Sequence, residues 1–517
     1  MEYYKKLEKL ISITNDLNDI INIAKNHYKL LNFKEFTNII NMVIYKRKCF
    51  PDNYIFSLKL AVNLAVLFGS MTIDNGFICK VRKKDLKLEE SIFINFINRV
   101  YDLYVHEQTK MSKEIESVSF KAYMTYHFDF SSISISQYLK LFKLFDTVSN
   151  KVYGFSIYKL VPFILFLTSD EQVDMFTNER RITNQVITRK DLKRYVDENN
   201  LPEEIISKLF LDRSQCKGVF PTDITKLLRG KIGISSKKNY LVPQTHFILE
   251  YVLKELFQNE YSKDKKGYLL EEYVKELLVS FFKNEKVYHS IYDENGSEND
   301  FLIVGNNLLA SIECKAQDFH EVFRDRNKAE KRLRNRFSSV IKKARKQCNR
   351  IENYINSNET SVFYDSDDRN TRKQIFSIKN NQVERLVKIV ITLDDYLNLA
   401  ESSQNFLDED YSDVWVVNIF SLEKILWACN YDVNKFKDYV VYRTSGIDTI
   451  SSIFSDELAH FGYYNSPNFN MIPPNNTGVH IHLMNNFTKL FDYYDIETLE
   501  IELKKLGEDK LNIKFIL

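Results

Sequence analysis

The spacing of apolar residues divides the chain into two parts. Over residues 1–215, apolar positions recur every three or four residues, as in YYKKLEKLISITNDLNDIINIAKNHYKLL and SQYLKLFKLFDTV. This is the spacing of the buried face of an amphipathic helix. Thr188 precedes the run RKDLKRYV and is a candidate N-cap. We therefore predict a mostly α-helical domain over 1–215. It carries no motif that assigns a role, and a sensor, a surface for self-association and a nucleic-acid clamp are all compatible with it.

The pattern changes in the next segment, 216–243. Gly218, Pro221, Gly230 and Gly233 fall within it, and glycine and proline at this density mark loops and short strands. We predict that this segment connects two domains.

Helix-like and strand-like stretches alternate after this segment. Helices are predicted over 245–258, 267–283, 320–357 and 421–430, and strands over 286–292, 300–304, 308–314, 386–393 and 413–420. This alternation is typical of a mixed sheet with helices on its faces, so we predict an α/β domain over 244–480. The polar stretch Ser357–Gln374 is predicted to be an exposed insertion, and 481–517 a C-terminal extension.

Composition limits the class of protein without naming its function. The 517 residues are 44% hydrophobic and 27% charged, which indicates a folded chain of more than one domain. The six cysteines form no CxxC pair, which argues against a zinc ribbon or a disulfide framework and favours the reducing cytoplasm. The N-terminus lacks the layout of a signal peptide, and the longest apolar run, Leu160–Leu167, is too short to span a membrane.

Charged residues stand at the ends of a predicted hairpin, in the stretch ENDFLIVGNNLLASIECKAQ. With Asn306 and Asn307 at the centre of a tight turn, Asp300 lies opposite Glu313. Lys315 follows two residues later and therefore shares their face, while Ile312 and Cys314 point to the other side.

Two carboxylates held this close repel each other unless a cation compensates them. Lys315 compensates in part, and Mg²⁺ does so better, because proteins hold it with one or two carboxylates and leave several waters on it. The lysine can then orient a water or stabilise the charge on a phosphate. The hairpin is therefore predicted to be a metal site that acts on a phosphodiester.

Asp, a spacer and then Glu-x-Lys at the end of an apolar strand resembles the signature of the PD-(D/E)xK nucleases, which have the restriction-endonuclease-like fold. The resemblance extends over roughly 240–465, in the order helix, three strands, helix, strand. KGYLLEEYVKELL resembles the family's acidic helix, with Gly267 and Leu270 before Glu271, and SSVIKKARKQCNRIENYI offers Gln347. Asn299 stands where the family name has Pro.

The resemblance implies a role for each of these residues. Asp300 and Glu313 would bind Mg²⁺, or Mn²⁺ in its place, with the Cys314 carbonyl as a third protein ligand. Lys315 would be the catalytic lysine. Glu271, preferred over its neighbour Glu272, would be a further acid, and Gln347 an auxiliary polar residue.

The helix after the hairpin is strongly basic. Residues 324–350 hold twelve Lys or Arg against Asp325 and Glu330, in a chain whose net charge is only +2. A solvated helix normally mixes the two signs, so we predict a nucleic-acid contact. The residues assigned to it are Arg332, Arg334, Arg336, Lys342, Lys343, Arg345 and Lys346. The alternative is pairing with acidic stretches such as YDSDD or LDEDYSD.

The sequence thus predicts a Mg²⁺-dependent nuclease of the PD-(D/E)xK type, with DNA expected over RNA because most of the family that it resembles acts on DNA. The N-terminal region is a candidate for homo-oligomer formation, and a defence role rests on analogy alone. The alternative is a catalytically silent nucleic-acid-binding or assembly protein that keeps the nuclease fold as a scaffold. A purely helical interaction protein would require the basic helix to be buried.

Overall fold

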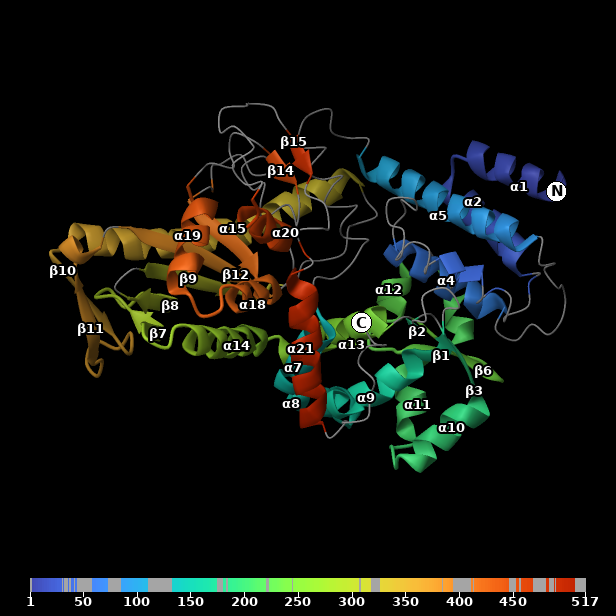
Figure 1. The fold of residues 1–517 in the computed structure, drawn as a ribbon, viewed down its shortest axis with the longest axis horizontal. Coiled ribbons are helices and arrows are strands. Elements are labelled where there is room, and N and C mark those ends of the chain that lie inside the picture. Colours follow the sequence, from blue (N-terminus) through green and yellow to red (C-terminus); the bar gives the residue numbers. More distant parts are fainter. Residues whose placement is uncertain are drawn as a thin grey trace. The chain divides into compact units, whose positions relative to one another are not determined.

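The computed structural model describes residues 2–29, 31, 36, 39–40, 42–43, 58–72, 85–109, 133–173, 180–182, 185–219, 223–243, 245–305, 308–317, 326–383, 385–393, 411, 413–445, 452–454, 457–467, 480–482, 488 and 490–506. The chain forms two compact units (Figure 1). Unit 1 comprises 1–110, 125–262 and 496–517, and unit 2 comprises 111–124 and 263–495.

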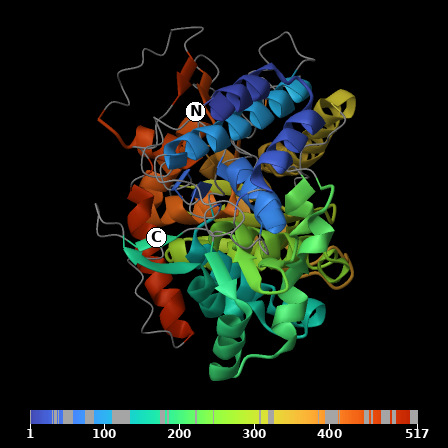
Figure 2. The same cartoon turned by 90° about the vertical axis from the view of Figure 1, so that its right-hand side faces the viewer.

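The first helices of unit 1 enclose an aromatic core. They are α1 (Glu2–Ile13), α2 (Leu17–Tyr28), α4 (Leu58–Thr72) and α5 (Leu86–Thr109), and Figure 2 shows them side by side in blue. The fully buried Tyr28 ring lies 5.0 Å from that of Phe68 and 6.0 Å from that of Phe93. The predicted helical region is confirmed here. These three rings come from the apolar sides of α2, α4 and α5 and pack together in the core.

Unit 1 continues with more helices and a small sheet. The helices are α7 (Ile135–Leu144), α8 (Asp146–Tyr153), α9 (Ile157–Thr168), α10 (Arg189–Glu198), α11 (Glu204–Leu209), α12 (Ile224–Leu227) and α13 (Thr245–Gln258). The strands are β1 (Ser169–Val173), β2 (Arg180–Ile182), β3 (Gln185–Thr188), β4 (Phe210–Asp212), β5 (Gly233–Ser235) and β6 (Asn239–Val242). Thr188 caps α10 as predicted, accepting the Asp191 N–H.

The segment 216–243 is not a connector, because its two strands complete a four-stranded sheet in the order β3-β6-β5-β4. Ile234 of β5 pairs with Leu241 of β6, and both side chains are buried. Helix α13 also belongs to unit 1, so the boundary between the units falls at 262/263 rather than near 243. In strands this short, apolar and polar residues alternate over too few positions for the strand to be recognised in a glycine-containing sequence.

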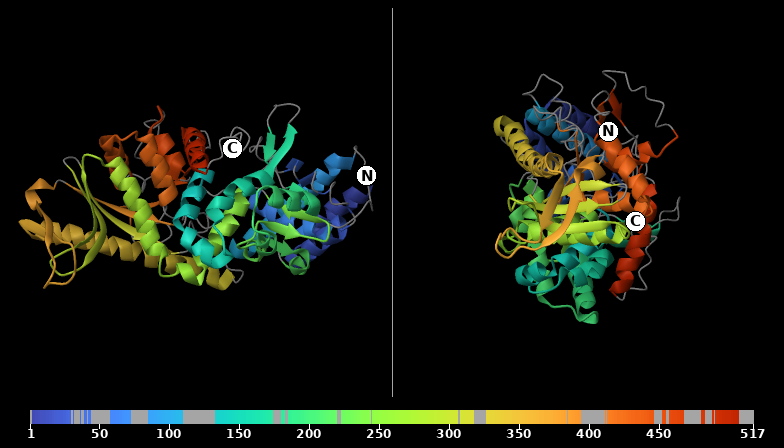
Figure 3. Two further views of the ribbon diagram at one scale, coloured as in Figure 1. Left: turned by 90° about the horizontal axis from the view of Figure 1, so that it is seen from below. Right: turned by 90° about the vertical axis from the view of Figure 1, so that its left-hand side faces the viewer.

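Unit 2 is built on a seven-stranded mixed sheet, in the order β11-β10-β7-β8-β9-β12-β13 (Figure 3). The strands are β7 (Lys286–Tyr292), β8 (Glu298–Val304), β9 (Leu309–Lys315), β10 (Thr360–Tyr364), β11 (Gln374–Lys379), β12 (Leu386–Thr392) and β13 (Val414–Asn418). β8 is antiparallel to both of its neighbours, β7 and β9, whereas β9, β12 and β13 are parallel. This confirms the predicted mixed α/β domain.

Helices cover both faces of this sheet. α14 (Lys266–Phe281) and α18 (Ile419–Ala428) pack together on one face, and α15 (Arg326–Ser357) lies across the other (Figure 1). Unit 2 also contains α19 (Val433–Arg443), β14 (Ser452–Phe454), α20 (Glu457–Tyr464) and β15 (His480–His482), and α21 (Leu490–Lys505) follows. Ile351 and Ile355 of α15 pack on Leu302 and Leu309 of the hairpin, which fixes the basic helix against the predicted site.

Two predictions for this domain are wrong. Ser357–Gln374 is not an insertion, since it contains β10, whose Phe363 is buried between the rings of Tyr354 and Phe376. β10 buries only alternate residues, and a polar loop follows it. The stretch therefore looks polar throughout in the sequence. The strand predicted over 413–420 ends at Asn418, because the Asn418 side chain accepts the Ser421 N–H and caps α18.

Candidate active site

The register of the β8–β9 hairpin is the predicted one. Phe301 pairs with Ile312 and Val304 with Leu309, and the Gly305 N–H donates to the Leu308 carbonyl at 2.9 Å. The predicted turn residues Asn306 and Asn307 lie outside the described residues. Because a slip of one residue would turn every side chain to the opposite face, this register brings Asp300 and Glu313 to the same end of the two strands.

The alternation of side chains along β7 and β8 breaks next to Asp300. β7 pairs His289 with Phe301 and Ile291 with Asn299, and Ser290 between them has a φ of 49°. A positive φ is uncommon for a residue other than glycine, and such residues concentrate at functional sites. The break brings Asn299 onto the face of Ser311 and Glu313, so Asn299, rather than Asp300, bonds across the hairpin to Glu313.

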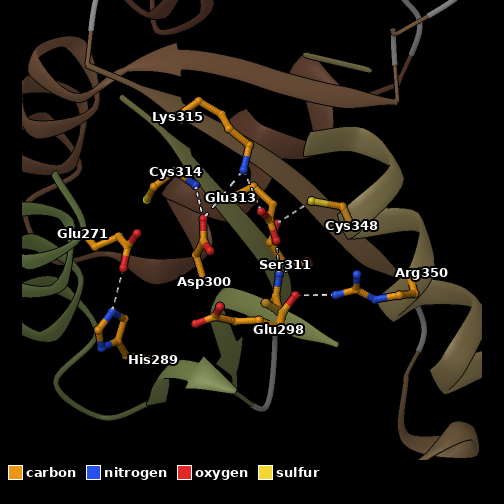
Figure 4. A network of polar contacts seen from close by, with 11 residues as sticks. Glu271, His289, Glu298, Asp300, Ser311, Glu313, Cys314, Lys315, Cys348 and Arg350 are labelled. Carbon is orange, nitrogen blue, oxygen red and sulfur yellow. Dashed lines mark hydrogen bonds and ion pairs between the residues drawn. The ribbon is translucent and has the colours of Figure 1, made fainter. Parts of the chain in front are cut away.

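Glu313 is fully buried and bonded at both oxygens (Figure 4). The Asn299 Nδ2 donates to Oε1 at 2.8 Å and to the Ser311 Oγ at 3.1 Å. The Lys315 Nζ donates to Oε2 at 2.9 Å. A buried carboxylate needs such donors to offset its lost hydration, so Asn299 and Lys315 hold Glu313 in one orientation.

Asp300 lies on the open side of this ion pair. Its Oδ2 accepts the Cys314 N–H at 2.7 Å and lies 4.0 Å from the Lys315 Nζ. Both contacts use the same oxygen, and the Asp300 side chain is 15% exposed. The structure therefore brings together the three predicted residues Asp300, Glu313 and Lys315, with Lys315 bound to both carboxylates.

A second acidic group lies beside the first. Glu271 on α14 lies with its Oε2 3.5 Å from the His289 Nε2 of β7, and Figure 4 shows its carboxylate turned toward Asp300. Glu272 instead lies near Lys275, at 3.6 Å, which supports the choice of Glu271. His289 is thus a neighbour of the site that the sequence pattern does not single out.

The carboxylates of this site repel one another. Burial, and then the negative charge of Asp300, raises the pKa of Glu313 to about 7. Burial, followed by Asp300 and Glu298, raises the pKa of Glu271 to about 7 as well. Burial opposes the charge of Lys315, but Glu313 and Asp300 outweigh it and raise the pKa of this lysine. One lysine therefore neutralises only part of the negative charge.

These residues are better suited to binding a Mg²⁺ ion than to forming a structural zinc site. Among the described residues, no three His, Cys, Asp or Glu side chains are grouped to hold a metal ion, which disfavours a structural zinc site. Mg²⁺ needs only one or two carboxylates. The Asn299 Oδ1 and the Gln347 Oε1 are buried oxygens without a hydrogen-bond partner in the described part of the chain, and unpaired oxygens of this kind suit a hard cation or its waters.

The remaining predicted site residues are placed less directly. Gln347 lies on α15 next to Cys348, whose Sγ–H donates to the Ser311 carbonyl of β9 at 3.7 Å. Cys314 is buried, and its N–H is used by Asp300. Burial, and then the charges of Asp300 and Glu271, raises the pKa of its thiol well above the usual range.

The described cations of α15 differ in exposure and in pairing. Lys343 and Lys346 are exposed, while Lys342 is half-buried. The Arg345 Nε lies 2.8 Å from the Asp413 Oδ1, an ion pair with the acidic stretch LDEDYSD that was the alternative interpretation. The side chains of Arg332, Arg334 and Arg336 lie outside the described residues.

Residues 266–378 match the family model of the nuclease-related domain, NERD. The match begins at the first residue of α14 and ends within β11, so it contains Glu271, Asp300, Glu313 and Lys315. No curated protein and no solved structure matches the chain. Unit 2 therefore contains a nuclease-related domain. No helix in the described part of the chain has the length and apolar character needed to cross a membrane.

Sequence reasoning underrated Asn299 and His289 in this domain. Asn299 precedes Asp300, and regular alternation would turn it to the other face of β8. A polar residue within an apolar strand was the available signal, but only the structure shows that Asn299 is buried and donates to Glu313.

Proposed function

We propose that this protein is a metal-dependent nuclease that hydrolyses phosphodiester bonds, with its active site at Asp300, Glu313 and Lys315. The observation that carries the proposal is the position of the Lys315 Nζ, 2.9 Å from Glu313 and 4.0 Å from Asp300, inside a domain that matches a nuclease-related family. The proposed enzyme is of the PD-(D/E)xK type and has the restriction-endonuclease-like fold of the family that the sequence resembles.

Asp300 and Glu313 would hold Mg²⁺, or Mn²⁺ in its place, with the Cys314 carbonyl as a further oxygen. The ion would supply positive charge for the phosphate and lower the pKa of a bound water. Asn299 keeps Glu313 in position, and Lys315 carries a fixed positive charge to the open side of the carboxylates. That charge can orient the attacking water or stabilise the negative charge that develops on the phosphate.

Glu271 would act as a further acid of the site. With a pKa of about 7 it exists in both protonation states near neutral pH, which is the property needed to exchange a proton with a water or a leaving group. Gln347 would act as an auxiliary polar residue through its unpaired Oε1.

DNA is the proposed substrate in preference to RNA. The preference rests on the PD-(D/E)xK family that the sequence resembles, most of which acts on DNA. The exposed Lys343 and Lys346 of α15 supply positive charge next to β9, which favours contact with the phosphate backbone of either nucleic acid. Cleavage of both strands of a duplex would need two active sites, so self-association through the N-terminal region is part of the proposal. The described cysteines are unpaired, and a cytoplasmic location stays a prediction.

The test is a cleavage assay with a panel of substrates. Supercoiled plasmid, linear DNA and RNA are incubated with the protein and Mg²⁺, Mn²⁺ or EDTA, beside Lys315→Ala. We expect cleavage of DNA that needs the metal and is lost in the variant, while circular dichroism shows that the variant is folded. Cleavage by Lys315→Ala at the rate of the unchanged protein would contradict the proposal.

One observation favours the second candidate function, a silent nucleic-acid-binding or assembly protein. Both oxygens of Glu313 already have donors within the protein, so an ion must displace one donor or bind beside it. Such a protein would bind nucleic acid but would not cleave it, whichever metal ion is added. Glu313→Ala would leave that binding unchanged.

A further inference from the structure

Unit 1 carries a cluster of exposed cations that the nuclease-related domain does not explain. Arg189, Lys190 and Lys193 lie on the first turns of α10, and Lys237 and Lys238 lie at the tip of the β5–β6 hairpin. All five side chains are exposed. We call these five residues the α10 basic surface.

The α10 basic surface is unpaired, in contrast with its neighbours. In the described part of the chain, Arg194 on the same helix lies 3.4 Å from Asp191, and Lys208 on α11 lies 3.1 Å from Glu204. None of the five cations has a carboxylate within 4.0 Å among the described residues. Unpaired charges of one sign repel each other, so an anionic ligand would stabilise this arrangement.

The two parts of the surface are fixed against each other. The Arg189 N–H donates to the Lys238 carbonyl at 3.0 Å, and its Nε donates to the Ser236 carbonyl at 3.1 Å. The guanidinium also lies 5.6 Å from the centre of the Tyr240 ring. The helix and the hairpin tip therefore present their charges as one rigid surface, which lowers the entropy cost of binding.

A groove of about 570 Å³ continues from this surface. Arg189 and Lys193 line its basic part, and Phe210 and Tyr240 belong to its apolar lining. Asp197, Glu203 and Asp212 also line it, and the charge of Asp212 interacts with that of Arg189. Phosphates are therefore favoured along the lysines and disfavoured beside these acids. The charge distribution thus determines where an anionic ligand can lie and how far along the groove it can extend.

We propose that the α10 basic surface binds the phosphate backbone of a nucleic acid, as a second contact on unit 1. The ligand is a polyanion rather than a single phosphate, because the five cations come from two elements and do not converge on one pocket. Lysine predominates, and as a point charge it holds phosphates without the bidentate geometry that reads bases. The contact is therefore independent of sequence and does not depend on whether unit 2 cleaves.

The test measures binding by the full chain in EDTA, which prevents metal-dependent cleavage. Fluorescence anisotropy with labelled duplex DNA, single-stranded DNA and RNA is recorded from 50 to 300 mM salt. Lys190→Glu/Lys193→Glu is expected to weaken binding on the order of tenfold and to lower the slope of log K against log salt by about 2, since each phosphate contact contributes about 0.9. The three ligands show which backbone is preferred.

Two further variants keep the result interpretable. Lys237→Glu/Lys238→Glu removes the other half of the surface and should give the same loss. Lys5→Glu/Lys9→Glu changes two exposed lysines of α1 by the same charge and should change neither affinity nor slope by a comparable amount. Wild-type affinity and slope in both surface variants would overturn the proposal, as would equal losses in the α1 control. Binding of labelled poly-glutamate without any binding of nucleic acid would overturn the proposal and indicate an acidic protein partner instead.

Discussion

Asn299 donates a hydrogen bond from its Nδ2 to the Oε1 of Glu313, 2.8 Å away across the β8–β9 hairpin. Both side chains are completely buried. The Lys315 Nζ binds the other oxygen of the same carboxylate. The two donors therefore hold the Glu313 carboxylate from both sides.

Asn299→Ala should weaken metal-supported cleavage. Removing the donor leaves a buried carboxylate oxygen unpaired and raises the pKa of Glu313 further, so the metal competes with a more tightly held proton. Losses of this kind typically amount to about 10–100-fold in metal affinity or activity. The measurement is the cleavage rate as a function of Mg²⁺ concentration, where we expect a higher half-saturating concentration.

A matched control is Asn295→Ala, in the exposed turn between β7 and β8. It should cleave as the unchanged protein does. Equal Mg²⁺ dependence in Asn299→Ala and the unchanged protein would show that Asn299 does not position Glu313.

Lys315→Met should destabilise the fold as well as abolish cleavage. Breaking a buried ion pair by removing one partner costs about 3–5 kcal/mol, because the other charge is left uncompensated. The double variant Glu313→Gln/Lys315→Met removes both charges and should recover most of that stability while staying inactive. Urea unfolding measures both values, and a double variant less stable than Lys315→Met alone would contradict the pairing.

The effect of Mg²⁺ on thermal stability should grow with pH. The folded protein holds the protons of Glu313 and Glu271 up to about pH 7, whereas the unfolded chain releases them near the ordinary value of 4.5. Their contribution to stability is therefore full below about pH 4.5 and is lost as the pH rises through 7. Mg²⁺ needs the ionised carboxylates, so its stabilisation should be larger at pH 8 than at pH 5.5.

Differential scanning fluorimetry with and without Mg²⁺ measures this dependence. Each kcal/mol of binding should raise Tm by about 2–4 °C. Glu313→Gln should reduce the shift at pH 8, while an equal shift at both pH values would argue against these carboxylates as ligands.

The cations of α15 should divide into two groups. Lys343→Glu/Lys346→Glu should weaken nucleic-acid binding and lower its salt slope by about 2, because both lysines are exposed. Arg345→Ala should chiefly lower stability, since it removes the partner of Asp413. Anisotropy and thermal unfolding of the same two proteins separate the effects. The reverse pattern, with stability lost in the lysine variant and affinity lost in Arg345→Ala, would refute this division.

Much of unit 2 follows from its sequence. Continuous apolar runs predict the buried strands β9 and β12, and the limits predicted for β7 agree with the structure. The hairpin register was also predictable, because the Asn306–Asn307 turn and the apolar pattern favour the same pairing. Local spacing is sufficient where a strand is long and buried on both sides.

Other features depend on contacts between distant residues. Strand β10 is stabilised by the packing of Phe363 on Phe376 of the edge strand β11, and a polar loop separates the two strands in the sequence. The role of Asn299 depends on its contacts with Ser311 and Glu313 of β9, twelve and fourteen residues later in the chain. The burial that raises the pKa of Glu313 also comes from elements packed around it, and no local pattern reports it.

The central claim is that Asp300, Glu313 and Lys315 form the active site of a metal-dependent nuclease. The most direct test is the single-turnover rate of DNA cleavage at increasing Mg²⁺ concentration, for the unchanged protein, Asp300→Asn and the exposed control Glu294→Gln. The account predicts a rate that saturates with Mg²⁺ in the unchanged protein and the control, and falls at least about 100-fold in Asp300→Asn. Cleavage by Asp300→Asn at the unchanged rate would contradict it.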